Sequence, residues 1–527
     1  MKKLYMTAIA LMGAISMHAQ GWPADYEGVM LQGFYWNSYR ASKWQKLEAQ
    51  ADDLAPYFSL VWIPQSANCG SGRSMGYDDL YWFNNYNSSF GNEAELRSMI
   101  RTFRNKGIGT IADVVINHRN TLTSWTDFPV ETYKGVTYRM YPADICHDDD
   151  EGNTYNWANS QTPKVSLSNK YDSGDGWNGI RDLDHYSSNV QTVVKAYLDM
   201  LLNDLGYAGF RYDMVKGYAG LFTGIYNSAA KPRFSVGEYM DGNATTVKAW
   251  INATKVNGEP TSAAFDFPVR YAVRDLIASK WSGKAKEGLA SDPTYRRYAV
   301  SFVENHDTEY RSSSEQQDPI RQDTLAANAY ILSSCGTPCI FYKHWIAYPT
   351  DIKMMINARH AAGIANTSNT TFNEYTGSQC NVLKTEGSHG TLYAVMGANA
   401  DAYKAPAGFT EILRGHNYRY LLSNSSNVAW VDLPSGRYDN VQKARLTAVS
   451  DQQGAQLVYT TDGTLPTAQS RKAASGTLID IPTGTTTLNV GLLVGTTVSA
   501  VATRTYQISP SDSFSPYDIT VNVNVDN

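Results

Sequence analysis

Acidic side chains follow three apolar segments of the chain that have the composition of buried strands. Asp213 follows "GFRY", Glu238 follows "FSVG" and Asp307 follows "YAVSFVENH". A single acid at a strand end commonly caps the next helix or pairs with a nearby arginine. Three of them on parallel strands of one sheet would instead meet on one rim. Two carboxyl groups that flank a scissile bond can hydrolyse a glycosidic linkage, because one donates a proton to the leaving oxygen while the other attacks the anomeric carbon.

Basic and imidazole side chains occur in the same segments. Arg211 lies two residues before Asp213, and therefore on the same face of the strand. We expect its charge to lower the pKa of Asp213 and keep this carboxylate ionised, whereas Glu238 needs a less charged setting to keep its proton. His306 ends the third segment and His118 ends another apolar run. We therefore expect both imidazoles at the same rim.

Eight short apolar runs recur along the chain, and stretches with apolar residues three and four positions apart, as in helices, follow them. The runs lie at residues 28–36, 59–65, 110–118, 209–215, 233–239, 263–268, 298–305 and 338–342. Apolar strands that alternate with helices favour a parallel sheet covered by helices, and eight such units favour closure into a barrel. The predicted fold class is therefore α/β, a (β/α)8 TIM barrel, whose chemistry lies at the C-terminal ends of the strands.

Changes in this pattern divide the chain of 527 residues into several parts. We expect the barrel at residues 20–118 and 186–365, an inserted loop-rich subdomain at 119–185, an antiparallel β-sheet domain at 366–437, a β-sandwich module at 438–509, and a linker or the start of a further β module at 510–527. The insertion follows the third strand of the barrel. Loops of this length in a compact domain are usually functional or ion-bound.

The N-terminus has the charged, apolar and small-residue order of a secretory signal peptide, "MKK" followed by "LYMTAIALMGAISM" and "HAQ". Cleavage near Ala19 would export the protein to the periplasm or the extracellular space. No later segment approaches about 18 consecutive apolar residues, so we expect no membrane span. The formal net charge of −5 gives no basic field that would gather phosphate groups, so we expect no nucleic-acid partner. We expect a monomer.

Four short segments carry a resemblance to a known family. "DVVINHR" (113–119), "GFRYDMVKGY" (209–218), "VGEYMD" (236–241) and "FVENHDT" (302–308) resemble the signature regions of the α-amylase family, glycoside hydrolase family 13, in order and in spacing. The segments "LQGFYW" and "GTPCIFY" are most similar to plant-type α-amylases. This resemblance implies a secreted hydrolase that cleaves α-1,4-glucosidic bonds within starch, glycogen or maltooligosaccharides.

The resemblance also implies a role for each acidic residue of the trio. Asp213 would be the nucleophile that forms a covalent β-glucosyl intermediate, with Arg211 beside it. Glu238 would be the general acid and then the base that activates water. Asp307 would grip sugar hydroxyls and stabilise the oxocarbenium-like transition state.

Further residues match substrate contacts of the family. Tyr77, in "MGYDDLYWFN", resembles the aromatic platform under the reacting sugar ring. His118 and His306 would hydrogen-bond the same ring. Lys216 would reach it from the side of the leaving group.

A calcium ion (Ca2+) is the cofactor that the resemblance implies. Asn117, Asp172 and Asp182 match the side-chain ligands, and backbone carbonyls near Asp175 and at Gly217 would complete an all-oxygen shell, as calcium prefers. The ion would tie the insertion to the barrel beside the nucleophile. The alternative is that "YDSGDG" forms a solvated turn without an ion.

Other outcomes stay open for the catalytic part and for the C-terminal module. A related family member could be maltogenic, transglycosylating or α-1,6-acting, and a non-catalytic starch-binding protein could keep the barrel without the reaction. The intact acidic trio argues against the last of these. The segment after residue 455 resembles the β-sandwich module at the C-terminus of chitobiase-type enzymes, where a spacer and a weak sugar-binding role are equally open.

Overall fold

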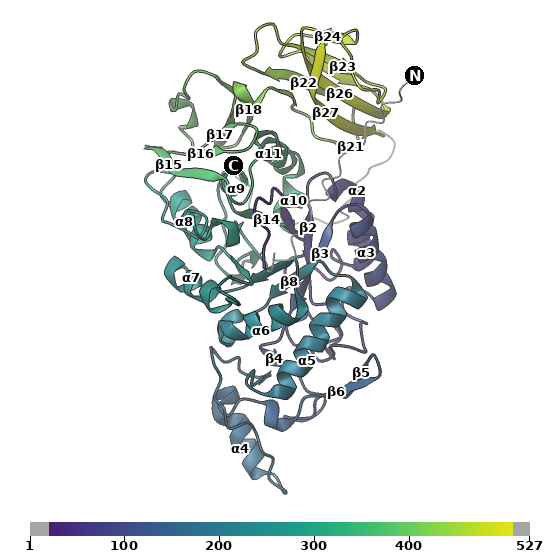
Figure 1. The fold of residues 1–527 in the computed structure, drawn as a ribbon, viewed down its shortest axis with the longest axis vertical. Coiled ribbons are helices and arrows are strands. Elements are labelled where there is room, and N and C mark those ends of the chain that lie inside the picture. Colours follow the sequence, from purple (N-terminus) through teal and green to yellow (C-terminus); the bar gives the residue numbers. More distant parts are fainter. Residues whose placement is uncertain (1–20, 510–527) are drawn as a thin grey trace.

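Eight parallel strands of the computed structural model close into a barrel (Figure 1), which confirms the predicted fold class. The structure describes residues 21–509, and the predicted signal peptide (1–19) and final segment (510–527) lie outside the described residues. The barrel strands are β1 (Met30–Gln32), β2 (Leu60–Ile63), β3 (Gly109–Val114), β8 (Gly209–Tyr212), β9 (Phe234–Gly237), β10 (Ala263–Phe265), β11 (Ala299–Phe302) and β14 (Thr337–Phe341). Each lies within one of the predicted apolar runs or overlaps it.

Helices surround the barrel on its outer side. They are α1 (Trp44–Ala49), α2 (Ala51–Leu54), α3 (Glu93–Asn105), α5 (Ser188–Asp199), α6 (Gly220–Ala230), α7 (Ala244–Ala253), α8 (Phe267–Ala278), α9 (Thr324–Ser333), α10 (Tyr342–Ala347) and α11 (Pro349–Ala362). Local signals set their starts. Asn92 and Glu95 form a reciprocal capping box at α3, and the Asp266 side chain caps α8 before a proline in its first turn.

The insertion between β3 and β8 is small and rich in loops. It contains β4 (His118–Arg119), β5 (Glu131–Tyr133), β6 (Val136–Tyr138), η1 (Pro142–Asp144), η2 (Asp149–Gly152), α4 (Asn153–Ser160) and β7 (Arg181–Asp182). β4 pairs with β7, and this pairing sets His118 opposite Asp182. Two buried ion pairs, Arg119 with Glu131 and Arg181 with Asp149, hold the loops together. The first and last parts of the insertion are therefore joined to each other shortly after the end of β3.

A five-stranded antiparallel sheet follows the barrel. Its order is β15 (Asn369–Gly377), β16 (Cys380–Glu386), β17 (Thr391–Met396), β19 (Tyr418–Ser423) and β18 (Phe409–Gly415). This sheet covers α9, and all ten residues of that helix are buried. A helix that is buried on every side explains why "TLAANAYILS" has no polar face.

The C-terminal module consists of two further sheets. One contains β20 (Val428–Val431), β22 (Gln442–Val449) and β25 (Leu478–Ile481), and the other contains β21 (Gly436–Tyr438), β27 (Thr497–Ile508), β26 (Gly484–Val494), β23 (Gln456–Thr460) and β24 (Arg471–Ala473). β20 lies before residue 438, where the sequence suggests that the sandwich begins, and β21 ends at that residue. Both pair with strands of the module, so its sheets begin at Val428.

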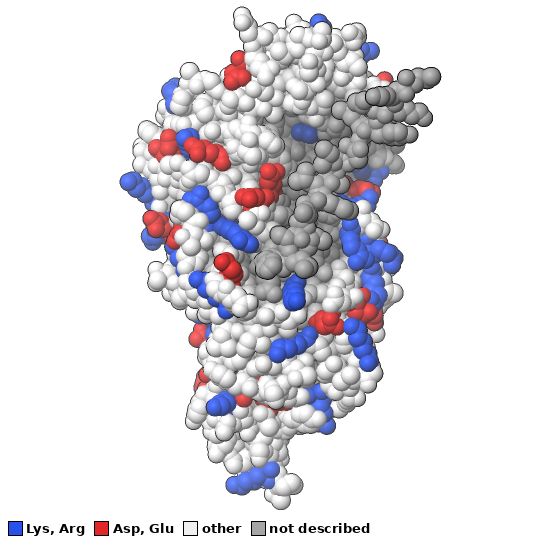
Figure 2. All heavy atoms as spheres, viewed as in Figure 1, with Lys and Arg blue, Asp and Glu red and all other residues white. Residues whose placement is uncertain are grey.

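The module and the insertion lie at opposite ends of the molecule (Figure 1). The Tyr57 hydroxyl, shortly before the start of β2, donates to the Ser435 carbonyl at 3.1 Å. The module thus meets the N-terminal ends of the barrel strands, whereas the insertion leaves from the C-terminal end of β3. On the face drawn in Figure 2, basic and acidic side chains are interspersed over the barrel. No helix among residues 21–509 is long and apolar enough to cross a bilayer.

Trp430 tests how strongly the module is joined to the rest of the chain. On β20 its side chain packs in the main core, whereas Ala429 and Val431 pack in the core of the sandwich. We predict that Trp430→Ala lowers the free energy of unfolding by about 3–5 kcal/mol, because a large buried side chain is lost. Urea denaturation measures this change. Leu465→Ala, at a position that is 65% exposed in the same module, is the control and should stay within about 0.5 kcal/mol of wild type. Equal urea midpoints for wild type, Trp430→Ala and Leu465→Ala would show that β20 does not join the two cores.

Candidate active site

Three adjacent barrel strands place the first charged side chains of the site. Asp113 lies on β3 and Arg211 on β8, and these two residues are opposite each other in the parallel pairing. Asp213 follows β8 directly and Glu238 follows β9 directly. Because β8 and β9 are also paired, the two acids emerge side by side at the C-terminal rim. The predicted convergence of these strand ends is therefore present.

The guanidinium of Arg211 is the centre of this cluster, and it is fully buried. Its Nη1 donates to Asp113 Oδ1 at 2.7 Å and to Asp213 Oδ1 at 2.6 Å. Its Nη2 lies 2.9 Å from Glu238 Oε1. One cation thus contacts three carboxyl groups, each of which is itself at least nine-tenths shielded from solvent.

Burial raises the pKa of all three carboxyl groups. The pKa of Glu238 rises to about 8, that of Asp213 to about 7 and that of Asp113 to about 6. In each case desolvation of the charged form is the largest effect, and the charge of Arg211 opposes it. Of the three carboxyl groups, Glu238 has the highest pKa and therefore keeps its proton to the highest pH.

The expected lowering of the Asp213 pKa by Arg211 is present, but it does not decide the net shift, which is upward. Arg211 does lower this pKa, but burial and the neighbouring carboxylate of Asp113 raise it by more. An arginine two positions away is visible in the sequence, whereas the loss of solvent around the carboxylate is not. The pKa of Glu238 is still higher than that of Asp213, so Asp213 loses its proton at lower pH than Glu238 does.

The backbone after β8 orients Glu238. Met214 adopts a left-handed conformation with φ 42° and ψ 52°, which is costly for a residue with a side chain. Its N–H donates to Glu238 Oε2 at 3.1 Å. With Oε1 near Arg211, both carboxyl oxygens of Glu238 are held by groups of β8 or the turn after it.

Asp307 lies nearer to solvent than the other acids. Its side chain is 34% exposed, with Oδ2 3.1 Å from His306 Nε2 and Oδ1 3.7 Å from Arg311 Nη2. Its negative charge raises the pKa of both Asp213 and Glu238, though less than burial does. All three predicted acids thus interact electrostatically with one another, and Asp307 is the most exposed of them.

Parallel aromatic rings form one wall of the site. Tyr77 and His306 are stacked with centroids 5.3 Å apart, and Trp36 lies parallel to both at 6.2 and 6.3 Å. Gln32 Nε2 donates to His306 Nδ1 at 3.0 Å, and His306 Nε2 lies 2.6 Å from the Tyr77 hydroxyl. Burial lowers the pKa of His306 to about 4, so its ring is neutral near pH 7.

Asp113 connects this wall to the charged cluster. Its Oδ2 accepts hydrogen bonds from the Tyr77 hydroxyl at 3.0 Å and from Trp62 Nε1 at 3.1 Å. The sequence places Asp113 at a strand end but gives it no role. Trp36, Trp62 and Gln32 are also absent from the predicted site. The segment "LQGFYW" points to the family, but it does not reveal the contact of Gln32 with His306, 274 positions away.

His118 lies behind Tyr77 with both ring nitrogens engaged. Nε2 donates to the Tyr77 carbonyl at 2.8 Å, and Nδ1 lies 3.3 Å from Asn117 Nδ2. Burial lowers the pKa of His118 to about 4. The neutral ring therefore has no spare N–H in this geometry, and a direct hydrogen bond to sugar would require one of these partners to be exchanged.

Lys216 lies on the side of the insertion. Its Nζ is 3.5 Å from Asp175 Oδ2 and 5.7 Å from the centroid of the Tyr239 ring. A third of the side chain is exposed. Lys216 thus stands at the rim, and its ion pair joins the loop after β8 to the insertion.

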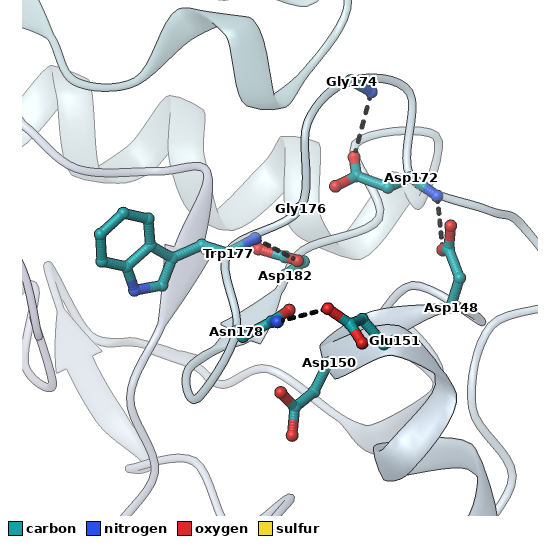
Figure 3. Close-up of a pocket in the computed structure, with 9 residues that line it drawn as sticks. All are labelled: Asp148, Asp150, Glu151, Asp172, Gly174, Gly176, Trp177, Asn178 and Asp182. Carbon is teal, nitrogen blue, oxygen red and sulfur yellow. Dashed lines mark hydrogen bonds between the residues drawn. The ribbon is translucent and has the colours of Figure 1, made fainter.

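Two of the five predicted calcium ligands, Asp172 and Asp182, line an acidic pocket in the insertion (Figure 3). Its volume is about 580 Å³, and its acidic lining residues are Asp148, Asp150, Glu151, Asp172 and Asp182. A Cβ at Gly176 would lie 3.3 Å from Asp182 Oδ2 and 4.0 Å from Asp172 Oδ2, so both oxygens face the space beside this glycine. Asn117 Nδ2 donates to Asp182 Oδ1 at 3.2 Å.

The loop that carries Asp175 packs against the predicted carbonyl ligand at Gly217. The Asp175 N–H donates to the Lys216 carbonyl at 2.9 Å, and a Cβ at Gly217 would lie 2.1 Å from Asn117 Oδ1. Asp175 points its own carboxylate outward, since this side chain is 64% exposed. Only its backbone could face an ion.

Two observations show that these residues fit an oxygen-coordinated cation. Asp172 Oδ2 is buried without a hydrogen-bond partner. Burial raises the pKa of Asp182 to about 8 and that of Asp172 to about 6, a cost that a cation would relieve. Within residues 21–509, no three His, Cys, Asp or Glu side chains are arranged to hold a metal ion by themselves. A shell here would therefore need the Asn117 amide and backbone carbonyls as well.

Comparison with protein families agrees with this geometry. Residues 70–370 match the family described as "Alpha amylase, catalytic domain", which is more than half of the chain. The chain belongs to the α-amylase family. It is thereby assigned to the glycoside hydrolases. Residues 433–505 match "Chitobiase/beta-hexosaminidase C-terminal domain", which confirms the second resemblance.

The chain is also similar in sequence to named enzymes and in fold to a solved structure. Probable alpha-amylase 2 of Arabidopsis thaliana is 28% identical over 352 residues, which are 62% of this chain and 78% of that protein. Glucan 1,4-alpha-maltotetraohydrolase of Roseateles saccharophilus is 28% identical over 428 residues, 74% of this chain and 71% of that protein. The crystal structure of gamma-CGTase from alkalophilic Bacillus clarkii has a TM-score of 0.56 at 12% identity and covers 93% of this chain and 98% of that chain. This last likeness shows the fold alone.

Asp182→Asn tests the fit of the acidic pocket to calcium. We predict that calcium raises the Tm of wild type by several degrees over the chelated protein, because a ligand that binds only the folded state stabilises it. Asp182→Asn should lose this gain. It should keep the Tm of the chelated wild type, because a carboxyl group with a pKa of about 8 is already mostly protonated at pH 7.

Thermal melts with calcium and with a chelator measure both effects. Asp480→Asn, an exposed position in the sandwich, is the control and should respond to calcium as wild type does. Melts of wild type that are identical with calcium and with the chelator would contradict the prediction.

Proposed function

We propose that this α-amylase family member is an endo-acting α-amylase that hydrolyses α-1,4-glucosidic bonds of starch, glycogen and maltooligosaccharides with retention of configuration. The observation that carries this proposal is the arrangement of Asp213 and Glu238 on two nitrogens of one buried guanidinium. Retaining glycosidases need their two carboxyl groups about 5 Å apart, and a shared guanidinium keeps two carboxyl groups close. The signal-peptide pattern of residues 1–19 supports export.

The first half of the proposed reaction breaks the glucosidic bond. The Asp213 carboxylate attacks the anomeric carbon while Glu238 gives its proton to the leaving glycosidic oxygen. The products are a covalent β-glucosyl ester of Asp213 and the released chain with a new 4-hydroxyl. The higher pKa of Glu238 supports this division, because the acid must keep its proton where the nucleophile has lost it.

The second half restores the protein. The ionised Glu238 takes a proton from water, the water oxygen attacks the anomeric carbon, and the bond to Asp213 breaks. Two inversions at the same carbon give net retention. The carboxylate of Asp307, at the mouth of the cluster, would stabilise positive charge on the sugar ring in both transition states. Tyr77 and His306 would lie against the same ring.

We further propose that the acidic pocket holds a calcium ion. Asn117, Asp172 and Asp182 would supply side-chain oxygens, and the backbone near Asp175 and at Gly217 would supply carbonyls. The ion would supply a fixed positive charge that cross-links the insertion to the loop after β8. That loop begins at the proposed nucleophile, so the cross-link would hold Asp213 in register with Glu238.

A different product pattern is the second candidate function. The similarity to a glucan 1,4-alpha-maltotetraohydrolase extends over 74% of this chain, which favours release of short products from chain ends as the alternative to internal cleavage. Amylose with blocked non-reducing ends separates the two. Internal cleavage lowers its viscosity at once, whereas an exo-acting hydrolase leaves it intact.

Glu238→Gln tests the proposed acid. We predict that it lowers the release of reducing sugar from amylose by about 10²- to 10⁴-fold, because the leaving oxygen no longer receives a proton. An aryl maltoside with a good leaving group needs less acid assistance, so the bond-breaking half should suffer less with this substrate. A reducing-sugar assay and release of the aryl group measure the two effects. Glu93→Gln, in the first turn of α3 with a side chain that is 47% exposed, should match wild type. Equal activity of Glu238→Gln and wild type on amylose would refute the assignment.

A further inference from the structure

Exposed aromatic side chains are concentrated in the insertion. Within residues 21–509 they are Tyr141, Tyr155, Tyr171, Trp177, Tyr186 and Tyr375. All but the last lie in or just after the insertion, a short part of the chain. Aromatic rings with one polar edge are suited to wet binding surfaces, and their faces can cover the C–H groups of a sugar.

Trp177 is the member of this set that contacts the proposed active site. Its indole stacks on the His118 imidazole with centroids 6.0 Å apart and an angle of 22° between the rings. By contrast, Tyr155 and Tyr171 pack around His147, and Tyr186 packs edge-on against Phe222. These tyrosines have their ring partners outside the predicted site.

Trp177 is held in place and yet remains half exposed. Its backbone N–H donates to Asp182 Oδ2 at 3.0 Å, which fixes the main chain at the edge of the acidic pocket. The side chain is 50% exposed. In Figure 3 the indole extends away from the carboxylates of Asp172 and Asp182. The main chain of this residue therefore belongs to the pocket, whereas its ring is available to another ligand.

The ring of Trp177 continues the aromatic wall outward. His118, beneath it, donates to the Tyr77 carbonyl, and the Tyr77 ring stacks on His306 beside the catalytic acids. The contacts thus run from Asp307 to His306, from there through Tyr77 and His118, and end at an exposed indole on the insertion. A glucan chain bound across the rim would reach this indole with a unit next to, or close to, the one being cleaved.

We propose that Trp177 is a stacking platform for a glucosyl unit of the bound chain, outside the subsite where the bond is cleaved. This inference deepens the proposed function and rests on it for the identity of the ligand. Stacking of an indole on the apolar face of one sugar would strengthen binding of long substrates by about 5- to 10-fold. It would leave substrates that are too short to reach the insertion almost unaffected.

Steady-state kinetics of Trp177→Ala and Trp177→Phe test the proposal. With maltoheptaose, the alanine variant should raise KM by about 5- to 10-fold with little change in kcat, and phenylalanine should restore most of the loss. With a p-nitrophenyl maltoside, KM should change by less than about 2-fold in both variants. Tyr186→Ala, which removes an exposed ring without a contact to the site, is the matched control and should behave as wild type with both substrates.

Binding without turnover separates this proposal from the proposed function. Calorimetric titration of maltoheptaose into Glu238→Gln and into Glu238→Gln/Trp177→Ala should give a Kd about 5- to 10-fold weaker for the double variant, whether or not wild type cleaves the sugar. Equal Kd values would overturn the role of Trp177. An equal rise of KM for the long and short substrates, together with a Tm in calcium lower than that of wild type, would also overturn it, because it would mean that the ring only supports the acidic pocket.

Discussion

The contact of one fully buried arginine with three carboxyl groups is the interaction on which the site depends. Transferring a carboxylate out of water costs several kcal/mol even after relaxation, and here three are gathered around a single guanidinium. One positive charge cannot balance three negative ones in a region of low dielectric. The cluster therefore keeps protons that isolated carboxyl groups would lose, and the differences in burial and partners decide where they stay. The parallel pairing of β8 with both β3 and β9 makes this possible, because it places the ends of the three strands side by side.

The barrel was predictable because its strands are buried on both faces. Such strands appear as continuous apolar runs, and the eight predicted runs correspond to the eight strands of the closed sheet. Strand partners in the C-terminal part were harder to predict. The alternation in "NVAWVDL" shows that β20 has two different faces, but not that Trp430 enters the main core while Ala429 and Val431 enter the sandwich. Which sheet a short strand joins depends on distant residues, and no local pattern contains that information.

The candidate site was predictable in its charged residues and less so in its supporting ones. Asp213 and Glu238 follow their strands directly and Asp307 lies in the loop after β11. Motifs place all three at one rim. Trp36 and Gln32 contribute to the aromatic wall through contacts with His306, far along the chain. The lowering effect of Arg211 on the pKa of Asp213 was predictable, but the net rise was not, because the sequence reveals a neighbouring charge and not the absence of solvent. Trp177 shows the same limit, since only the structure places its exposed ring on His118.

The insertion lies next to this site, whereas the C-terminal module lies far from it (Figure 1). The insertion brings the acidic pocket and Trp177 to the rim, whereas the module docks at the other end of the barrel. The exposed large apolar side chains of residues 438–509 are the aliphatic Val441, Leu465, Leu478 and Val501.

The pH dependence of kcat/KM for wild type and Asp113→Asn tests most directly whether crowding of carboxyl groups around Arg211 sets the protonation of the site. Asp113 raises the pKa of Asp213, so replacing it with a neutral amide should shift the acidic limb of the profile to lower pH, while the alkaline limb, which reports Glu238, moves less. An acidic limb that stays in place or shifts to higher pH would contradict the account.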